Sequence, residues 1–227
     1  LLKELVSLYE QEQTDFGPLQ FQYKDYAYHE QHVVNQAIDE KHFWHTYLRA
    51  LSTPSQLPGD FIRPKDARFE GRSVWLNTDQ EFNDKLSLFA EKHRTTRFAV
   101  FASALKLVLN YYTGDTDLVI GLPVAGRDSA ALQNQVGFYA NTLVLRTQLE
   151  PQTTSDSFVT SLHQNVLSVL SHSSYPVEQL IDELNIERET NRNPLFDVML
   201  AYHDGAHHQL PDTIADAKIS HIELEKH

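Results

Sequence analysis

Two adjacent histidines near the end of the chain, His207 and His208, have the residue type and spacing of a catalytic base. They lie in the stretch AYHDGAHHQLPDT, and Asp212 follows the second histidine four residues later. Imidazole exchanges protons near neutral pH, and a nearby carboxylate can orient it. With His203 and Asp204 beside them, these groups suit a base with its orienting acid, a metal site or a polar loop.

Neither a nucleophilic triad nor a metal centre has its usual signature here. No serine lies in the G-x-S-x-G turn that exposes a nucleophile, and no H-E-x-x-H helix accompanies the histidines. The chain has no cysteine, so disulfides and thiolate zinc sites are excluded. A metal held by His203, His207 and His208 is therefore the weaker interpretation, and no metal site is predicted.

The charge and composition of the chain limit its partners. Its 227 residues carry a formal net charge of −12 and 41% hydrophobic residues, enough for one large domain or two small lobes. Because phosphates are bound by clustered Lys and Arg, nucleic acid and anionic membranes are not expected as partners. No apolar run could span a membrane, no signal peptide opens the chain, and the lack of cysteine fits a cytoplasmic location.

The opening residues indicate a piece of a longer protein. The chain starts at Leu1, without methionine, on LLKELVSLYEQ, an amphipathic helical pattern that is already under way. We therefore expect further sequence upstream of Leu1.

Hydrophobic periodicity, caps and prolines predict the helices. Thr78 is expected to cap one of them, with Glu81 completing a capping box and Phe82, Leu86 and Phe89 facing inward. Gly114 is expected to end a strongly apolar helix. The other helices are predicted at residues 1–9, 25–51, 155–173 and 176–185.

Alternating or buried apolar runs predict the strands, and Pro54, Pro58 and Pro64 predict a linker before the first of them. This succession of strands and helices indicates an α/β fold with a largely parallel or mixed sheet covered by helices. The predicted strands are RSVWLNT (72–78), DLVIGLPVAGR (117–127), VGFYANTLVLRTQL (136–149), LFDVMLAYH (195–203) and AKISHIELE (217–225).

Two strings combine apolar strands with polar residues. IGLPVAGRD (120–128) predicts a sharp turn at the exit of a buried strand, and it lacks the glycine spacing of a phosphate loop. VGFYANTLVLR places Asn141 and Thr142 in an apolar strand, where they need hydrogen-bond partners and are expected to tie strands together or line a cleft. Arg192 and Asp197 are expected to form an ordinary charge pair.

Five strings in sequence order give the chain a resemblance to a known family. YKDYAYHEQ, IGLPVAGRD, VGFYANTLVLR, SYPVEQLI and NRNPLFDVML together resemble the condensation domains of nonribosomal peptide synthetases, over nearly the whole chain. The resemblance implies a chloramphenicol-acetyltransferase-like lobe. It divides the chain into helices leading out of a first lobe (1–52), a Pro-rich linker (53–72) and a C-terminal condensation lobe that is incomplete at its end (73–227).

The resemblance also implies a chemistry and its partners. Condensation domains join a donor acyl or peptidyl thioester to an acceptor aminoacyl thioester, both carried on phosphopantetheine arms of carrier proteins, in peptide antibiotic and secondary-metabolite biosynthesis. The expected partners are upstream and downstream peptidyl carrier proteins, the missing N-terminal lobe and an adjacent adenylation domain. No cofactor is expected to bind this chain directly, and positioning two tethered reactants supplies most of the catalysis.

The family motif HHxxxDG places the catalytic histidine upstream of Leu1. HHQLPDT has Thr213 in place of the glycine and follows NPLFDVML, whereas the family's motif precedes a helix like the one that opens this chain. We therefore expect no catalytic residue within residues 1–227, and we expect the isolated chain to be inactive. By motif, the resemblance assigns the shaping of the tunnel or lobe interface to Asp25, Tyr26, Gly126, Arg127, Gly137, Asn141 and Thr142. Tyr28 and His29 replace the family's usual tryptophan.

Two alternatives stay open from the sequence. One is a non-catalytic, condensation-like module that recruits carriers or tailoring enzymes. The other is an acyltransferase of the same superfamily that uses a soluble coenzyme A thioester.

Overall fold

The computed structural model describes residues 2–10, 15, 17–19, 21–34, 37–51, 56–66, 70–127, 129–133, 135–186, 188–203, 213–214 and 217–218. The helices are α1 (Leu2–Tyr9), α2 (Tyr23–Val34), α3 (Ile38–Tyr47), α4 (Gln80–Lys92), α5 (Arg97–Thr113), α6 (Ala130–Gln133), α7 (Ser155–Ser171) and α8 (Val177–Glu183). The strands are β1 (Asp117–Val124), β2 (Asn141–Gln148), β3 (Thr213–Ile214) and β4 (Ala217–Lys218).

The central sheet is mixed, as the sequence predicts. β1 and β2 pair antiparallel, from Asp117 opposite Gln148 to Val124 opposite Asn141. On the other side of β1, Gly121 forms a parallel bridge to Met199. β3 and β4 form a separate antiparallel pair of two residues each. The two antiparallel strands therefore hold the ends of their connecting segment, residues 125–140, close together.

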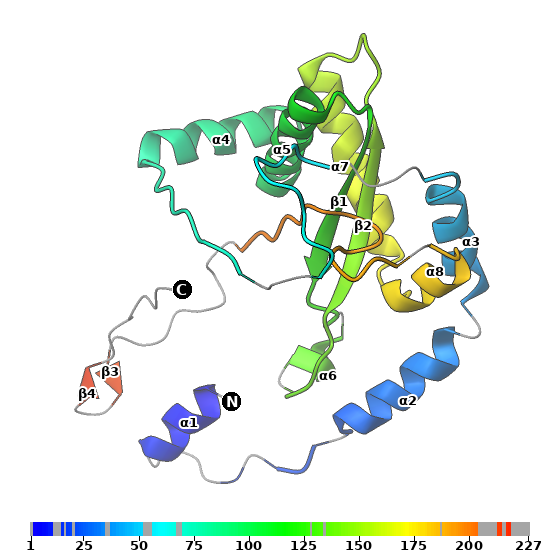
Figure 1. Ribbon diagram of the computed structural model, residues 1–227. Coiled ribbons are helices and arrows are strands. Elements are labelled where there is room, and N and C mark those ends of the chain that lie inside the picture. Colours follow the sequence, from blue (N-terminus) through cyan, green and yellow to red (C-terminus); the bar gives the residue numbers. More distant parts are fainter. Residues whose placement is uncertain are drawn as a thin grey trace.

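Helices cover the β1–β2 pair and complete the core. Figure 1 shows α5 and α7 side by side next to the two strands, with α3 and α8 together on another flank. Side chains on both faces of β2 are buried, so the strand is covered on two sides. The buried core combines residues from all of these elements: Trp44, Leu48, Ala102, Leu109, Leu118, Ile120, Leu143, Val144, Leu145, Leu162, Val166, Leu180 and Ile181.

Local signals account for the best-defined helix ends. Thr96 caps α5 by accepting a hydrogen bond from the N–H of Ala99, and Gly114 ends the helix with φ 76°, the left-handed geometry that favours glycine. Thr154 caps α7 through the N–H of Ser157. The predicted end of the apolar helix at Gly114 is therefore confirmed.

Several predicted elements are wrong in detail. The single helix expected over 25–51 is two helices, α2 and α3. Residues 72–78 form no strand, and Asp79 rather than Thr78 caps α4 by accepting from the N–H of Phe82. Phe82 is exposed rather than inward-facing. Local sequence favours these structures, but neighbours in space decide which ones form.

The predicted strand 195–203 is reduced to a single bridge, and most of the predicted strand 217–225 lies outside the described residues. In 195–203 only Met199 takes part in a bridge, and in 217–225 the strand β4 covers two residues, while residues 219–225 lie outside the described part. The predicted pair between Arg192 and Asp197 is also wrong. Asp197 accepts from Arg63 at 3.0 and 3.2 Å, and Arg192 lies 3.4 Å from Glu189.

None of the helices in the described residues is long and apolar enough to cross a membrane.

Candidate functional site

A cavity of about 460 Å³ opens where α2 faces the turn between β1 and β2. It brings together three segments that are far apart in the sequence: the start of α2, the connection after β1 and the turn before α8. Its walls are formed by Phe21, Asp25, Tyr26, His29, Glu30, Gly126, Ser129, Leu132, Tyr139, Asn141, Ser173 and Ser174.

One face of α2 supplies the acidic wall of the cavity. Asp25, Tyr26, His29 and Glu30 follow the spacing of neighbours on one helical face. A carboxylate oxygen of Asp25 accepts from the N–H of Gln22 at 2.7 Å and so caps the helix start. The Tyr26 hydroxyl donates to Glu30 at 3.2 Å. Two carboxylates are thereby held at this wall.

Tyrosine rings join α2 to the β1–β2 connection. The Tyr139 ring meets the rings of Tyr23 and Tyr26 edge-on, at centroid distances of 5.3 and 4.7 Å. Its hydroxyl donates to the side chain of Gln135, whose amide donates to the carbonyl of Phe21 at 2.8 Å. Edge-on aromatic pairs are favourable beyond simple burial, so this cluster fixes α2 over the connection.

Arg127 holds the connection in shape from within. Its guanidinium donates to the carbonyl of Leu132, to that of Gln135 at 2.8 Å and to that of Gly137 at 3.2 Å. Its Cζ also lies 4.3 Å from the centre of the Tyr139 ring. Arg127 is therefore part of the scaffold under the cavity and not one of its lining residues.

Two glycines allow the close packing of this region. Gly126 has φ 61°, and a Cβ there would lie 1.8 Å from the carbonyl oxygen of Tyr139. A Cβ on Gly137 would lie 2.6 Å from the Tyr23 ring and 2.7 Å from the Tyr139 ring. Any side chain at either position would push the aromatic cluster apart.

Asn141 ties the start of β2 to the turn before α8. Its side-chain amide donates to the carbonyls of Ser173 and Tyr175, each at 2.9 Å, and its Oδ1 accepts from the N–H of Thr142. Asn141 lines the cavity, whereas Thr142 lies beside it, opposite Pro123 in the strand pair.

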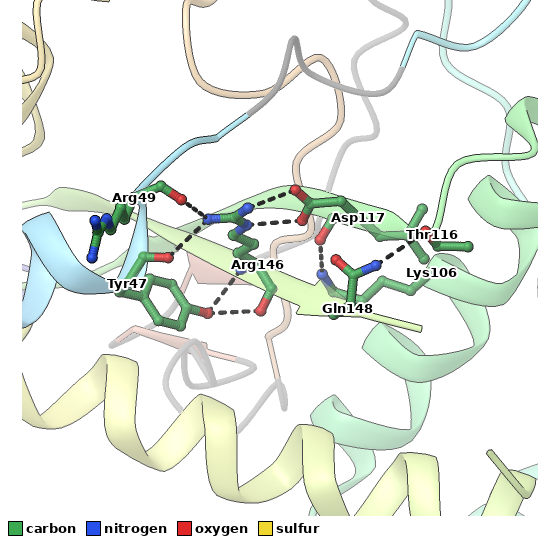
Figure 2. Close-up of polar contacts among 8 residues, drawn as sticks. Tyr47, Arg49, Lys106, Thr116, Asp117, Arg146 and Gln148 are labelled. Atoms are coloured by element: carbon green, nitrogen blue, oxygen red, sulfur yellow. Dashed lines mark hydrogen bonds and ion pairs between the residues drawn. The ribbon is translucent and has the colours of Figure 1, made fainter. Parts of the chain in front are cut away.

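A polar network holds the far end of the same strand pair. Figure 2 shows Arg146 of β2 making a two-pronged ion pair with Asp117 of β1, at 2.7 and 2.8 Å, and donating to the carbonyls of Tyr47 and Arg49. The ion pair raises the pKa of Arg146. The Tyr47 hydroxyl accepts from the N–H of Arg146 and donates to its carbonyl, each at 2.8 Å, and burial raises the pKa of Tyr47 to about 12.

Lys106 of α5 reaches the sheet from one face and is fully buried. Its ammonium nitrogen donates to the carbonyls of Leu118 at 2.7 Å and Leu145 at 2.8 Å, one on each strand. Loss of solvent around the buried amine lowers the pKa of Lys106 to about 7, against the opposing field of Asp117.

Glu183 connects α8 to α3 and to Tyr175, which follows the cavity-lining residues Ser173 and Ser174 in sequence. It accepts hydrogen bonds from Lys41 at 2.7 Å, His45 at 2.8 Å and Tyr175 at 2.9 Å. Burial alone would raise the pKa of this carboxyl, but the hydrogen bonds outweigh burial and lower it to about 2. The turn that carries Ser173 and Ser174 is thus fixed on its far side.

The seven predicted site residues fall into three groups in space. Asp25, Tyr26, Gly126 and Asn141 line the cavity, Arg127 and Gly137 lie in the scaffold beneath it, and Thr142 lies alongside. Five further lining residues were not predicted as site residues from the sequence: His29, Glu30, Tyr139, Ser173 and Ser174. The i, i+3 and i+4 spacing from Asp25 and Tyr26 would have indicated His29 and Glu30.

The histidine-rich stretch adds no described catalytic group. His203 is exposed, and Asp204, His207, His208 and Asp212 lie outside the described residues, as does Asp128. Within the described part of the chain, no three His, Asp or Glu side chains are placed to hold a metal ion. What the cavity offers is a partly apolar space with carboxylates on one wall and hydroxyl and amide groups opposite.

The HHxxxDG motif is expected upstream of Leu1, outside the residues that the structure describes, and its position stays a prediction.

Sequence comparison identifies related proteins. The family model "Condensation domain" matches residues 1–224. Tyrocidine synthase 3 of Brevibacillus parabrevis is 33% identical over 99% of this chain, and surfactin synthase subunit 1 of Bacillus subtilis (strain 168) is 33% identical over 88%. The chain spans only 3% and 6% of the lengths of these two relatives.

Solved structures share the fold. The X-domain in its complex with OxyB from teicoplanin biosynthesis is 26% identical, with a TM-score of 0.76 over 82% of this chain and 42% of its own. The first condensation domain of the calcium-dependent antibiotic synthetase is 22% identical, with a TM-score of 0.66 over 81% of this chain and 43% of its own. The second likeness concerns the fold alone.

Proposed function

Because this chain belongs to the condensation-domain family, we propose that it forms one wall of the substrate tunnel in a condensation domain of a nonribosomal peptide synthetase. In this proposal the domain joins a donor acyl or peptidyl thioester to an acceptor aminoacyl thioester, both carried on phosphopantetheine arms of carrier proteins. An upstream and a downstream carrier protein, the N-terminal lobe and an adjacent adenylation domain would be its partners, in the cytoplasm.

One observation carries the proposal. Four residues that the family resemblance assigns to the tunnel come from three motifs and line one cavity of about 460 Å³: Asp25, Tyr26, Gly126 and Asn141. Such a space can hold the end of a tethered substrate, and its rigid scaffold favours reaction by proximity. The proton-handling histidine would come from upstream of Leu1, since His203 is exposed and away from the cavity walls.

The test is amide formation by the natural protein that carries these residues. Donor-loaded and acceptor-loaded carrier proteins are mixed with it, and product is measured by mass spectrometry. Ser174→Trp fills the cavity from its rim, so we expect amide formation to fall at least ~10-fold. Ser171→Trp, on an exposed position outside the cavity, should leave the rate unchanged. Equal rates in the two variants would contradict a role for the cavity.

A second candidate function is recruitment of another protein without catalysis. The observation in its favour is that the X-domain, found in complex with OxyB, matches this chain with a higher identity and TM-score than the condensation domain of the calcium-dependent antibiotic synthetase. If the natural protein forms no amide from loaded carriers yet retains a protein partner through this lobe in a pull-down with purified components, recruitment replaces condensation.

A further inference from the structure

The cavity beside α2 carries negative charge that the described residues do not neutralise. Glu30 is half-buried at its wall, and Asp25 stands on the same wall. Neither carboxylate forms an ion pair within the described part of the chain. No lysine or arginine is among the described residues that line the cavity. The lining therefore suits a positively charged guest.

Both carboxylates keep one oxygen available for such a guest. Oδ2 of Asp25 accepts from the N–H of Gln22, and Oε1 of Glu30 accepts from the hydroxyl of Tyr26. The other oxygen of each carboxylate accepts no hydrogen bond from the described residues. The existing bonds hold the two side chains in place, so the remaining oxygens are oriented acceptors. Hydrogen bonds from a cationic donor to a carboxylate are the strongest of their kind.

Another part of the lining is apolar. Phe21, Leu132 and Tyr139 contribute to the cavity walls, and Tyr139 is only 3% exposed. A side chain such as that of lysine packs its alkyl stem on apolar groups while its charged end reaches a polar region. The volume of about 460 Å³ lies in the range of pockets that hold small ligands. The cavity thus matches an alkyl stem that ends in a cation.

The surroundings favour an organic cation over a metal ion. Within the described part of the chain, no three His, Asp or Glu side chains are placed to hold a metal. Magnesium and calcium take about six or more oxygen ligands. Arg127 opposes any cation by its own charge, but its guanidinium is bound to three backbone carbonyls beneath the cavity. One positive charge against the two carboxylates still leaves a negative balance.

We infer that the cavity binds the side chain of a substrate that carries an ammonium or guanidinium group on an alkyl stem. Glu30 selects for the charge, because it is half-buried, whereas Asp25 is exposed to screening by salt and also caps the helix start. The inference names a substrate class for the proposed condensation reaction and so rests on that function.

Two stable probes test the charge preference without requiring catalysis. Lysyl aminopantetheine, in which an amide replaces the thioester, is compared with its norleucyl counterpart, which lacks the side-chain amine. Isothermal titration calorimetry measures both affinities for the natural protein that carries these residues. We expect the lysyl probe to bind at least ~10-fold more tightly. Equal affinities overturn the inference, because Glu30 then meets a cation from elsewhere in the domain or none at all.

Glu30→Gln removes the charge and keeps an oxygen that can accept from the Tyr26 hydroxyl. In this variant the preference should shrink to less than ~3-fold, while the norleucyl probe binds as before and shows that the cavity is intact. Glu178→Gln is the matched control, because it removes an exposed carboxylate of α8 outside the cavity and should keep the full preference. An equal loss in both variants, or no loss in Glu30→Gln, overturns the role of Glu30.

Amide formation separates this inference from the proposed function. Lysine and norleucine are loaded in turn on one carrier at a time, and the rates with the natural protein are compared. If amide forms equally well from both and the two probes bind equally, the reaction stands and the charge preference is wrong. If neither gives amide but the lysyl probe binds at least ~10-fold more tightly, the preference stands and the proposed reaction is wrong.

Discussion

Strand β2 and residues 70–78 are both extended stretches of the chain. They differ in whether their outward-facing backbone N–H and carbonyl groups have hydrogen-bond partners. At β2, Tyr47 and Asn165 satisfy the outward-facing N–H and carbonyl of Arg146, and Arg146 itself is paired with Asp117. At 70–78, no backbone group has a backbone partner among the described residues, and Val74, Trp75 and Leu76 are exposed. Side chains satisfy the outward-facing backbone groups of Arg146, whereas those of residues 70–78 have no backbone partner among the described residues.

The buried polar contacts at β2 stabilise the lobe, whereas the exposed side chains of residues 70–78 contribute little to its stability. Removing a group from the closed edge leaves buried polar atoms unsatisfied, which is costly. Truncating a side chain in residues 70–78 removes little burial, because the apolar side chains there are already exposed. The predictions below probe this difference, from the largest expected effect to the smallest.

Among the substitutions in the two extended stretches, Arg146→Met should destabilise the lobe most. The change removes the two-pronged ion pair with Asp117, whose side chain is 19% exposed, and the hydrogen bonds to the carbonyls of Tyr47 and Arg49. We expect a loss of about 3 kcal/mol in the free energy of unfolding, measured by urea denaturation. Arg188→Met is the control: its ion pair with Asp182 is exposed, so it should cost less than about 0.5 kcal/mol. Similar losses would contradict the special role of the closed edge.

Lys106 should make stability depend on pH. Burial lowers the pKa of its amine from 10.5 to about 7, so above pH 7 the unfolded chain binds more protons than the folded one. Stability contributed by this group therefore rises with pH, by about 2 to 3 kcal/mol between pH 7 and pH 9. Chemical denaturation at several pH values measures the slope.

Lys106→Met is the matching control for that slope. The variant keeps the length of the side chain and removes the titrating amine, so the rise between pH 7 and pH 9 should disappear. An unchanged slope in the variant would assign the pH dependence to other groups.

Tyr47→Phe should have a smaller effect, because only the hydroxyl is lost. The N–H of Arg146 then lacks its acceptor, while the ring remains packed. We expect a loss of about 1 to 2 kcal/mol by the same denaturation measurement. Tyr111→Phe, at a side chain that is 83% exposed, should change stability by less than about 0.5 kcal/mol. If both variants behave alike, the hydroxyl does not close the edge.

Leu76→Ala should have the smallest effect on the 227-residue chain. The side chain is 87% exposed, so truncation should change the free energy of unfolding by less than about 0.5 kcal/mol. Leu109→Ala, at a leucine that is 1% exposed, should cost about 2 to 5 kcal/mol. A cost above about 1 kcal/mol for Leu76→Ala would mean that the segment packs against the rest of this chain.

Much of the local structure follows from short-range signals. Buried apolar runs indicated β1 and β2, and Gly114 stops α5 because glycine readily adopts a left-handed backbone. The motif resemblance singled out Asp25, Tyr26, Gly126 and Asn141, which lie at one cavity. Asn141 was expected to tie strands together or line a cleft; it lines the cavity, and its amide binds the turn before α8 rather than a strand.

Other features depend on contacts that no local pattern records. The sequence places Arg127 only as a charged residue at the end of a turn. Its three carbonyl acceptors are brought to it by the fold of residues 132–137. Asp197 pairs with Arg63, 134 positions away, and not with nearby Arg192. Lys106 interrupts an apolar helix, and nothing in the helical pattern shows that its amine ends between two strands.

The sequence by itself determined the family, the mixed α/β class and the turn-forming glycines, because these depend on motif order, periodicity and backbone preference. It also determined that residues 72–78 have the alternation of a strand. Only the tertiary structure decided that these residues form no strand and have no backbone partner among the described residues, that Tyr47 binds the outward-facing N–H of Arg146 in β2, and that the motif residues meet at one cavity. Pairing and enclosure are properties of segments brought together in space, so no single stretch of sequence can specify them.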